Sequence, residues 1–266
     1  FTGVLTGKGL NWGGSLIRAQ NKQFEGVVNG IQDGSIIMPA VTQSLFPEMG
    51  LFALPFMFEG SGARTASIVG WKLYEQGMFS GVEKLRLLAF IGLDNAGIHL
   101  REPIEKFEDL QGLKLRTAGP EDAETIKALG GTPVALGISQ VTESMNRGVI
   151  DGALAAWAAV LQFRFLPIVK SHLDMPLRTR CLFFAIGREA YEGLPAAARK
   201  AIDDNSGLEF SIAYGAFMDK DAADVHAKAL KDGHTLVKYT KAQYQELRRK
   251  VQPIHDGWIQ STPNGR

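Results

Sequence analysis

One arginine lies where an α/β sheet usually holds a ligand. Residues 113–116 alternate apolar and basic side chains, which predicts a short half-buried strand ending at Arg116. Gly119 and Pro120 end that strand, and Pro120 suits the first turn of a helix over 121–129. Ligands of open α/β sheets bind at such strand ends, and a guanidinium grips a carboxylate through two parallel hydrogen bonds. The pattern fits a carboxylate clamp, or else a surface arginine finishing an edge strand.

The other residues capable of chemistry form no recognisable catalytic or metal-binding pattern. The five histidines are scattered, and none pairs with another at metal-ligand spacing. We expect surface roles for His226 and His255 on polar helix faces, and a solvated turn for His172 and Asp174 in preference to a metal contact. No serine sits in a nucleophile elbow, and no dinucleotide or phosphate-loop glycine pattern opens a helix. The sequence predicts a binding residue without a catalyst, and neither a metal nor a cofactor.

The composition is that of a globular protein with a substantial core. Hydrophobic residues make up 45% and charged residues 21% of the 266 residues. A net charge of +1 gives no electrostatic basis for binding nucleic acid, and no run reaches the ~20 apolar residues of a membrane-spanning helix. The single Cys181 is expected to be a small buried hydrophobe. Because Phe1 is not an initiator residue, we expect a processed or trimmed chain, and a removed signal peptide is one form of such processing.

The elements that must position Arg116 alternate between strands and helices, which predicts an α/β fold whose sheet has mostly parallel strands covered by helices. Residues 45–56 are expected to form an apolar loop or strand, and 180–187 a strand. Residues 195–232 then show one continuous helical pattern, long enough to lie along two lobes. The alternation covers strands at 97–100, 113–116 and 132–136 and helices at 106–110, 121–129 and 139–147.

Several segments resemble the solute-binding proteins of TRAP transporters, of the DctP type. Residues 107–119, which include Arg116, are similar to that family's "EDLKGLKIRTPG" signature. The resemblance runs from about Val28 to about Trp258, with the motifs in order and at the expected spacing. The other matching segments are residues 54–58, 128–134, 139–152 and 194–202.

The resemblance implies an α/β, two-lobe, periplasmic-binding-protein-like fold with hinge strands and a long helix bracing both lobes. Lobe 1 would comprise residues 1–95 with parts of 186–230, and lobe 2 residues 96–185 with parts of 231–266. It implies a periplasmic receptor, not an enzyme, which binds a small organic acid between the lobes. The receptor would deliver the acid to the membrane permease subunits of a TRAP transporter, without inserting into the membrane itself.

The resemblance also assigns ligand-binding residues. The family arginine that clamps the ligand carboxylate corresponds to Arg116. Members that bind dicarboxylates often carry asparagine at the position of Ala155, and a second family arginine corresponds to Asn95. Both departures favour a monocarboxylate with an apolar or aromatic body over a C4-dicarboxylate. The first fourteen residues do not match the family's first strand and helix.

Five further residues are candidates for contact with the acid. Trp157 follows a run of small residues, so its ring is expected either beside the cavity or in the core. Arg180 opens a strand and could supply a second charge or an interlobe salt bridge. Of the neighbours Phe183 and Phe184, one should face the core and one the cleft; Phe183 is our candidate. Gln43 and Asn95 are short polar residues on loops at strand ends.

Two other functions fit the residues less well. An isomerase or lyase acting on a keto or hydroxy acid on a similar scaffold would need a general acid or base beside Arg116, and the sequence offers no strong candidate. A structural or interaction protein without a ligand would need no cleft. A specific stabilisation by an organic acid, lost without the arginine and unaccompanied by turnover, would favour the receptor over both.

Overall fold

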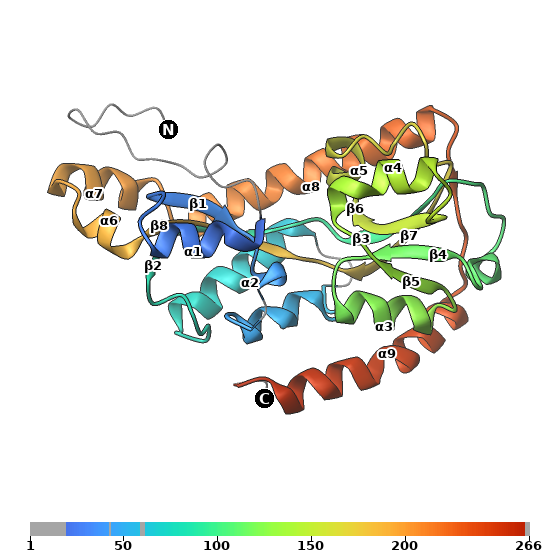
Figure 1. Cartoon of the computed structure of the whole chain (residues 1–266), viewed down its shortest axis with the longest axis horizontal. Coiled ribbons are helices and arrows are strands. Elements are labelled where there is room, and N and C mark those ends of the chain that lie inside the picture. The colour runs from blue at the N-terminus through green and yellow to red at the C-terminus, as the bar shows by residue number, and fades with distance from the viewer. Residues whose placement is uncertain (1–19, 43, 59–61, 264–266) are drawn as a thin grey trace.

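The computed structural model describes residues 20–42, 44–58 and 62–263, which fold around two β-sheets (Figure 1). The first sheet has three strands in the order β1 (Gly34–Ile37), β8 (Cys181–Gly187) and β2 (Leu85–Gly92). Both neighbours of β8 run antiparallel to it. This sheet is built from segments far apart in the chain: its central strand, β8, follows β3 to β7 of the second sheet in the sequence.

The second sheet has six strands and contains the strand that ends near Arg116. The three strands around that arginine, β5, β4 and β6, are parallel as predicted. Strands β7 and β9 are parallel too, but β3 runs antiparallel to both β6 and β7, and the first sheet is antiparallel, so the prediction of mostly parallel strands is wrong for those pairs. The strand order is β5 (Thr132–Ala135), β4 (Lys114–Thr117), β6 (Gly152–Ala156), β3 (Ala96–Leu100), β7 (Ser171–Arg178) and β9 (Thr235–Leu236).

The antiparallel pairing follows from how the chain passes between the two sheets. It leaves the first sheet through residues 93–95 into β3, and it returns from β7 through Thr179 and Arg180 into β8. Two strands that leave and return at the same edge must run in opposite directions, because a parallel pair would need a long crossover connection. The crossing segments are hydrogen-bonded to each other: Leu93 N–H donates to Arg180 O at 2.7 Å, and the Thr179 hydroxyl donates to Leu93 O.

We propose that the two lobes follow these two sheets. The first crossing then agrees with the boundary at residue 95 expected from the sequence. The second lies at residues 179–180, ahead of the expected boundary at 185, because all of β8 pairs within the first sheet.

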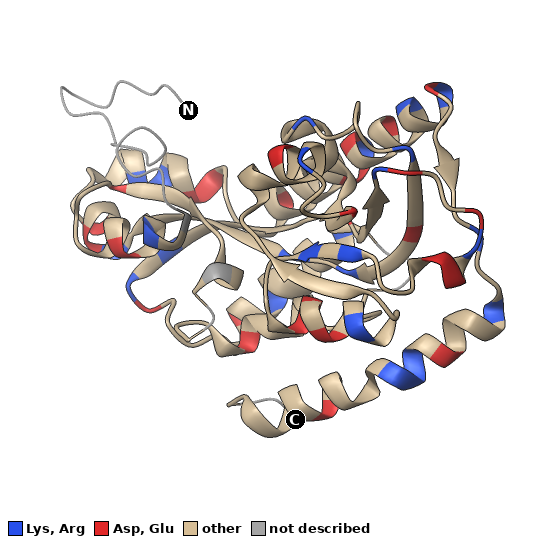
Figure 2. Ribbon diagram, turned by 45° about the vertical axis from the view of Figure 1, so that its right-hand side comes forward, with Lys and Arg blue, Asp and Glu red and all other residues tan. Residues whose placement is uncertain are grey.

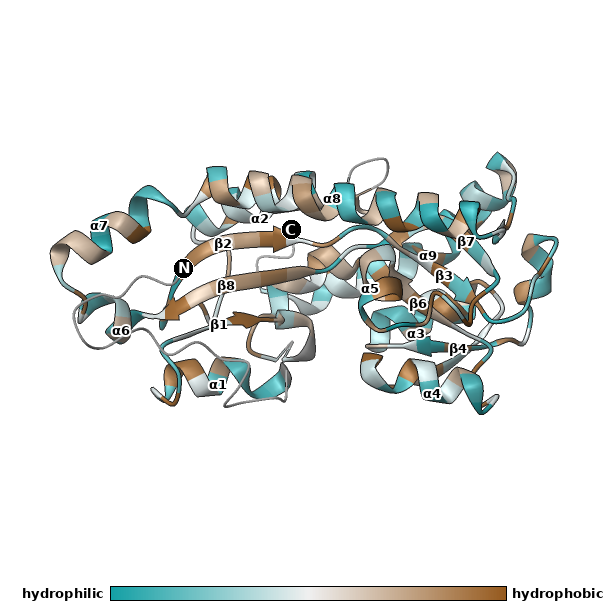
Figure 3. Ribbon diagram, turned by 90° about the horizontal axis from the view of Figure 1, so that it is seen from above, coloured by the Kyte–Doolittle hydropathy of each residue, from teal (hydrophilic) through white to brown (hydrophobic). Residues whose placement is uncertain are grey.

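One long helix, α8 (Leu208–Lys231), braces both sheets, as Figure 3 shows. It packs on α2 and β2 beside the first sheet and on α5 beside the second. This arrangement confirms the predicted α/β class with a long bracing helix. The other helices are α1 (Gln23–Val28), α2 (Ala63–Glu75), α3 (Pro120–Ala128), α4 (Val141–Asn146), α5 (Trp157–Gln162), α6 (Arg188–Glu192), α7 (Ala196–Asp204) and α9 (Lys241–Ser261).

The expectation of one continuous helix over 195–232 is wrong. The helix breaks at residues 205–207, between α7 and α8. Gly207 has φ = 95°, in the left-handed region that favours glycine, and its N–H donates to Leu88 O at 2.7 Å. The break therefore lets α7 turn away while the start of α8 stays fixed to β2.

Three apolar cores hold these layers together. The first sheet's core is rich in aromatic rings, and residues 45–56 contribute to it through a 3₁₀ helix, η3 (Pro47–Ala53), where a loop or strand was expected. The second sheet has a core on each face, one shared with α3 and α9 and the other with α4, α5 and α8. Close packing of this kind gives a stiff platform on which strand-end side chains keep their positions.

Candidate functional site

Arg116 lies at the carboxyl end of β4, as the sequence predicted, and is 5% exposed. Its Nε donates to Leu136 O at 2.9 Å and its Nη1 to Leu154 O at 3.2 Å. Among the described ion pairs, none involves this guanidinium. Burial lowers the pKa of Arg116 to about 10, so the side chain stays charged at neutral pH. Carbonyl groups therefore orient this cation without neutralising it.

Two further arginines at the crossing back to β8 share one buried acid. Asp122, in the first turn of α3, is fully buried. Its Oδ1 lies 2.5 Å from Arg178 Nε, and its Oδ2 accepts from Arg180 Nη2 at 3.0 Å and from Ala118 N–H at 2.9 Å. Burial alone would raise the pKa of Asp122, but Arg178 and Arg180 outweigh that effect and lower it to about 2. Burial and the nearby Arg180 lower the pKa of Arg178 to about 9.

We call Arg116, Arg178, Arg180 and Asp122 the arginine cluster. It holds three cations and one carboxylate, all at most 7% exposed. The half-buried Glu121 is a further acid close by: a Cβ added at Gly119 would lie 3.4 Å from its Oε2 and 3.7 Å from Arg180 Nη2. With Glu121 counted, the described residues of the cluster still carry three cations against two carboxylates. A buried charge without a counter-charge is costly, so the cluster is suited to receive an anion.

The cluster contains two of the residues predicted from the sequence, Arg116 and Arg180. It also contains two that sequence reasoning missed, Arg178 and Asp122. A local signal existed for each: Arg178 is two residues from Arg180, as on one face of a strand, and Asp122 follows the predicted turn after Arg116. What the sequence did not show is that α3 brings Asp122 between the two arginines of the crossing.

The contacts described for Asn95 and Phe183 are with residues outside the cluster. Asn95 is in the first crossing, where its Nδ2 donates to Phe58 O at 3.3 Å. Phe183 is fully buried in the first sheet's core, with its ring centroid 5.4 Å from that of Phe46 and 5.6 Å from that of Phe90. Gln43 lies outside the described residues. Ligand contacts from these three residues stay predictions.

Trp157 begins α5 directly after β6 and is 4% exposed. Its backbone N–H donates to Asp94 Oδ2 at 2.6 Å, and its Nε1 donates to Asp174 Oδ1 at 2.9 Å. Its ring packs between His99 and His172, with centroid distances of 4.7 and 4.6 Å. The indole is therefore part of the core that the second sheet shares with α4, α5 and α8. A direct contact between Trp157 and a ligand stays a prediction.

The expectation of scattered histidines is wrong, because three of them surround Trp157 and a fourth, His234, stacks on His172. His99 and His172 face each other from the paired strands β3 and β7, and both are fully buried, so His172 is not in a solvated turn. His226 on α8 packs against the indole at 4.9 Å, where a surface role was expected. Sequence spacing cannot reveal this group, since β-pairing and helix packing assemble it. The described residues contain no group of three or more side chains able to hold a metal ion.

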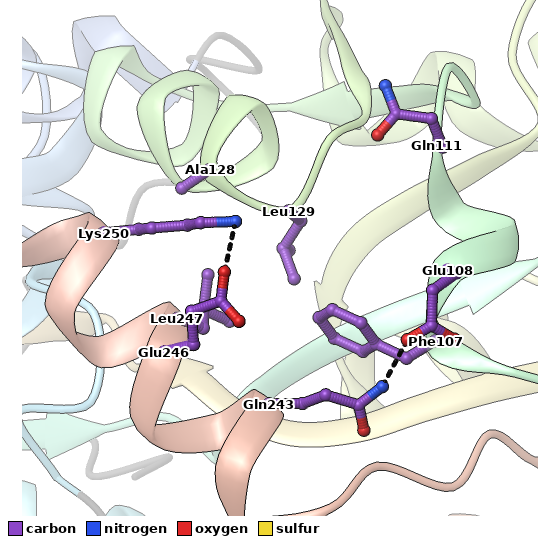
Figure 4. A pocket seen from close by; sticks show the side chains of 9 residues that line it. All are labelled: Phe107, Glu108, Gln111, Ala128, Leu129, Gln243, Glu246, Leu247 and Lys250. Carbon is purple, nitrogen blue, oxygen red and sulfur yellow. Dashed lines mark hydrogen bonds and ion pairs between the residues drawn. The ribbon is translucent and has the colours of Figure 1, made fainter.

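A pocket of about 400 Å³ lies away from the cluster, between η4 (Phe107–Leu110), α3 and α9 (Figure 4). Its charged groups pair with neighbours: Lys250 Nζ lies 3.0 Å from Glu246 Oε1, and Gln243 Nε2 donates to Glu108 Oε1 at 2.5 Å. Figure 2 shows acidic and basic residues interspersed along α9. The pocket offers no uncompensated cation for an anionic ligand.

Among the described residues, no helix is both long and apolar enough to cross a membrane.

Comparison with known proteins places this geometry in a family. The chain matches the model of the DctP family, bacterial extracellular solute-binding protein family 7, over residues 13–261. It is 26% identical over 237 residues to the uncharacterized protein YiiZ of Salmonella typhimurium, covering 86% of this chain and 70% of that protein.

Solved structures agree. A TRAP solute-binding protein from Rhodoferax ferrireducens, in complex with copurified benzoate, matches with a TM-score of 0.82 and 25% identity over 91% of this chain and 76% of its own. A marine metagenome TRAP solute-binding protein specific for aromatic acids has the same fold, with a TM-score of 0.84 and 24% identity over 91% of this chain and 77% of its own. The chain therefore belongs to family 7 of the bacterial extracellular solute-binding proteins, which are receptors of TRAP transporters and not enzymes.

Proposed function

We propose that this receptor binds a small organic monocarboxylate between its two lobes, with Arg116 gripping the carboxylate. The uncompensated positive charge of the arginine cluster carries this proposal. A ligand carboxylate would supply the missing negative charge through charge-assisted hydrogen bonds, which strengthen in a water-poor site. A neutral analogue would leave the buried cations uncompensated, and the site therefore rejects it.

The body of the ligand is apolar or aromatic in this proposal. Beyond the carbonyl that holds Arg116, β6 continues with Ala155, which is small and 2% exposed. Alanine offers no hydrogen bond to a second carboxylate or to a hydroxyl group. The benzoate bound by the Rhodoferax ferrireducens protein fits the same chemistry.

Binding closes the lobes in this proposal. The two hydrogen-bonded crossings are the natural hinge, because residues 93–95 and 179–180 connect the sheets there. Arg178 and Arg180 lie in or beside the second crossing, so an anion held with them would favour the closed arrangement over the open one. The closed receptor, in the periplasm, would then deliver its acid to the membrane permease of a TRAP transporter.

Thermal melting against a panel of organic acids tests this function. Benzoate, mandelate and pyroglutamate are suitable probes, with benzamide as the neutral analogue. We expect at least one acid to raise the melting temperature and benzamide to leave it unchanged, because only ligands of the folded state stabilise it. Arg116→Ala should abolish the shift.

The matched control is Arg147→Ala, since Arg147 is exposed and paired with Glu143 on one turn of α4. That variant should keep the full shift. If no acid stabilises the wild-type chain, or if Arg116→Ala and Arg147→Ala respond alike, the proposed function is wrong.

A further inference from the structure

We propose that His99, His172 and His234 form a proton relay that weakens the second sheet, and with it the grip on the acid, in mildly acidic solution. We call these three residues the histidine relay. Its effect on the ligand rests on the proposed function, whereas its effect on stability does not.

Hydrogen bonds fix where each proton of the neutral relay lies. His99 Nε2 lies 3.1 Å from Ala155 O, which can only accept, so this nitrogen carries the proton. His99 Nδ1 must then accept from His172 Nδ1, 2.8 Å away. His172 Nε2 in turn accepts from His234 Nδ1 at 3.0 Å. The three neutral rings thus have one consistent arrangement of protons. His234 donates to His172, His172 donates to His99, and His99 donates to Ala155 O.

The relay runs from the surface to the interior of the sheet. His99 and His172 are directly paired between β3 and β7, and both are fully buried. His234 is half-buried on the turn before β9. Among the relay's rings, only His234 meets solvent, so an added proton enters there.

The interior of the relay is poorly suited to a positive charge. His172 faces the rings of His99, His226 and His234. Asp174 is the acid whose charge favours a proton on His99, and its oxygens already contact Trp157 Nε1 at 2.9 Å and His226 Nε2 at 3.2 Å. Burial lowers the pKa of His99 to about 4, and burial with repulsion from His99 lowers that of His172 to about 2.

The outer end faces charges of both signs. His234 lies near Lys170 and Lys228, which oppose its protonation, and near Asp232, which favours it. Burial is the largest influence and, with Lys170, keeps the pKa of His234 below its ordinary value.

The sign of the pH effect follows. Unfolded histidines take up protons below about pH 6.5, whereas the folded relay resists them. The unfolded state then binds more protons than the folded state, so stability falls as the pH decreases from about 6.5 towards 4.

The inner end of the relay adjoins the arginine cluster. Ala155 O accepts from His99, and the preceding carbonyl, Leu154 O, accepts from Arg116 Nη1. A proton added at His99 Nδ1 would remove its acceptor and force His172 to reverse its own hydrogen bonds. The strand that holds Arg116 would lose part of its support, and affinity for the acid should fall with the pH.

Nuclear magnetic resonance of ¹⁵N-labelled imidazoles tests the relay without any ligand. At pH 7.5 we expect the proton on Nε2 of His99 and on Nδ1 of His172 and of His234. Neither inner ring should titrate near pH 6.5. The opposite tautomer at His172, or titration of His99 or His172 near pH 6.5, would overturn the relay.

A matched pair of variants tests its effect on stability. His234→Asn keeps a donor near the position of Nδ1 but removes the titrating ring. His255→Gln is the control, because His255 lies on α9 and contacts Pro55 O at 2.8 Å, outside the relay. Urea unfolding at pH 5 to 7.5 gives the number of protons taken up on unfolding. We expect this number to be smaller in His234→Asn than in the wild type, by up to about one. The decrease should be smaller in His255→Gln than in His234→Asn. Equal loss in the two variants would overturn the relay's role in stability.

Benzoate binding at pH 7.5 and 5.5 separates the two proposals, since this probe stays largely ionised over that range. Because only His234 at the outer end can take up a proton at pH 5.5, we expect wild-type affinity to fall by at most about fivefold, and by less in His234→Asn. Binding with the same pH dependence in both proteins would overturn the coupling while leaving the receptor intact. If benzoate binds at neither pH, mandelate or pyroglutamate takes its place; absence of binding by all three would count against the proposed function and its coupled part, while the tautomers and stability still decide the relay.

Discussion

Asp122 sets the balance of charge in the arginine cluster. It is the buried acid between Arg178 and Arg180. Arg116, in contrast, donates its hydrogen bonds to backbone carbonyl oxygens. Removing one member of a buried ion pair strands the charge of its partners, which costs more than the pair itself contributes. The residue is therefore as important for keeping the cations in place as for neutralising one of them.

Replacing Asp122 with asparagine should destabilise the protein by about 3–5 kcal/mol, because two buried guanidinium groups would lose their carboxylate. Urea unfolding at pH 7 measures this. The control is Asp151→Asn, since Asp151 accepts from Lys114 N–H at 2.8 Å on the exposed side of the same sheet. A cost no larger than that of the control would contradict the account.

The pH dependence of Asp122 has a definite sign. Its pKa is lowered to about 2 in the folded state, against an ordinary value near 4. Its contribution is thus present above pH 4 and is lost as the pH falls from about 4 to 2. Unfolding free energies over this range should decline more steeply in the wild type than in Asp122→Asn; parallel curves would show that the pair does not form.

At the scale of elements, the sequence predicted what is encoded locally. Alternating residues before Arg116 and Pro120 at the start of α3 fixed the strand–turn–helix unit, and both features are confirmed. The break before α8 was missed because the helical pattern continues on both sides of residues 205–207. Pairings between distant segments were also missed: Asp122 with Arg180, 58 residues apart, and His99 with His172, 73 residues apart, depend on how sheets and helices pack.

Two glycines test the backbone conformations assigned to α8 and α9. Gly207, with φ = 95°, should tolerate alanine poorly, so Gly207→Ala is expected to lower stability by about 1 kcal/mol or more. Gly257 lies inside α9, and a Cβ there would meet nothing within 4 Å, so Gly257→Ala should raise stability by about 0.5–1 kcal/mol. Thermal unfolding measures both; effects of the same sign would contradict the assigned backbone conformations.

At the scale of the whole molecule, two helices connect the lobes besides the crossings. α8 packs against elements of both sheets, and α9 runs from the second sheet's core to Pro47, where Trp258 Nε1 donates at 3.3 Å. The proposed closure would therefore be a limited rotation around the crossings, with these helices bending or sliding. The arginine cluster lies beside the second crossing. An anion bound there would therefore act at a place where a small rotation reorients both lobes.

Small-angle X-ray scattering tests the closure. Saturation with an acid that stabilises the protein should decrease the radius of gyration, because the lobes approach each other. Arg116→Ala at the same acid concentration should keep the value of the free receptor. An unchanged radius in the saturated wild type would indicate that the acid binds without closure.

The central claim is that buried, uncompensated arginine charge selects a carboxylate, and calorimetric titration tests it most directly. The panel acid with the largest melting shift is compared with its amide, which has nearly the same shape without the charge. We predict that the acid binds at least about 30-fold more tightly, since leaving a buried charge unpaired costs about 2 kcal/mol or more. Equal affinity for the acid and its amide would contradict the account.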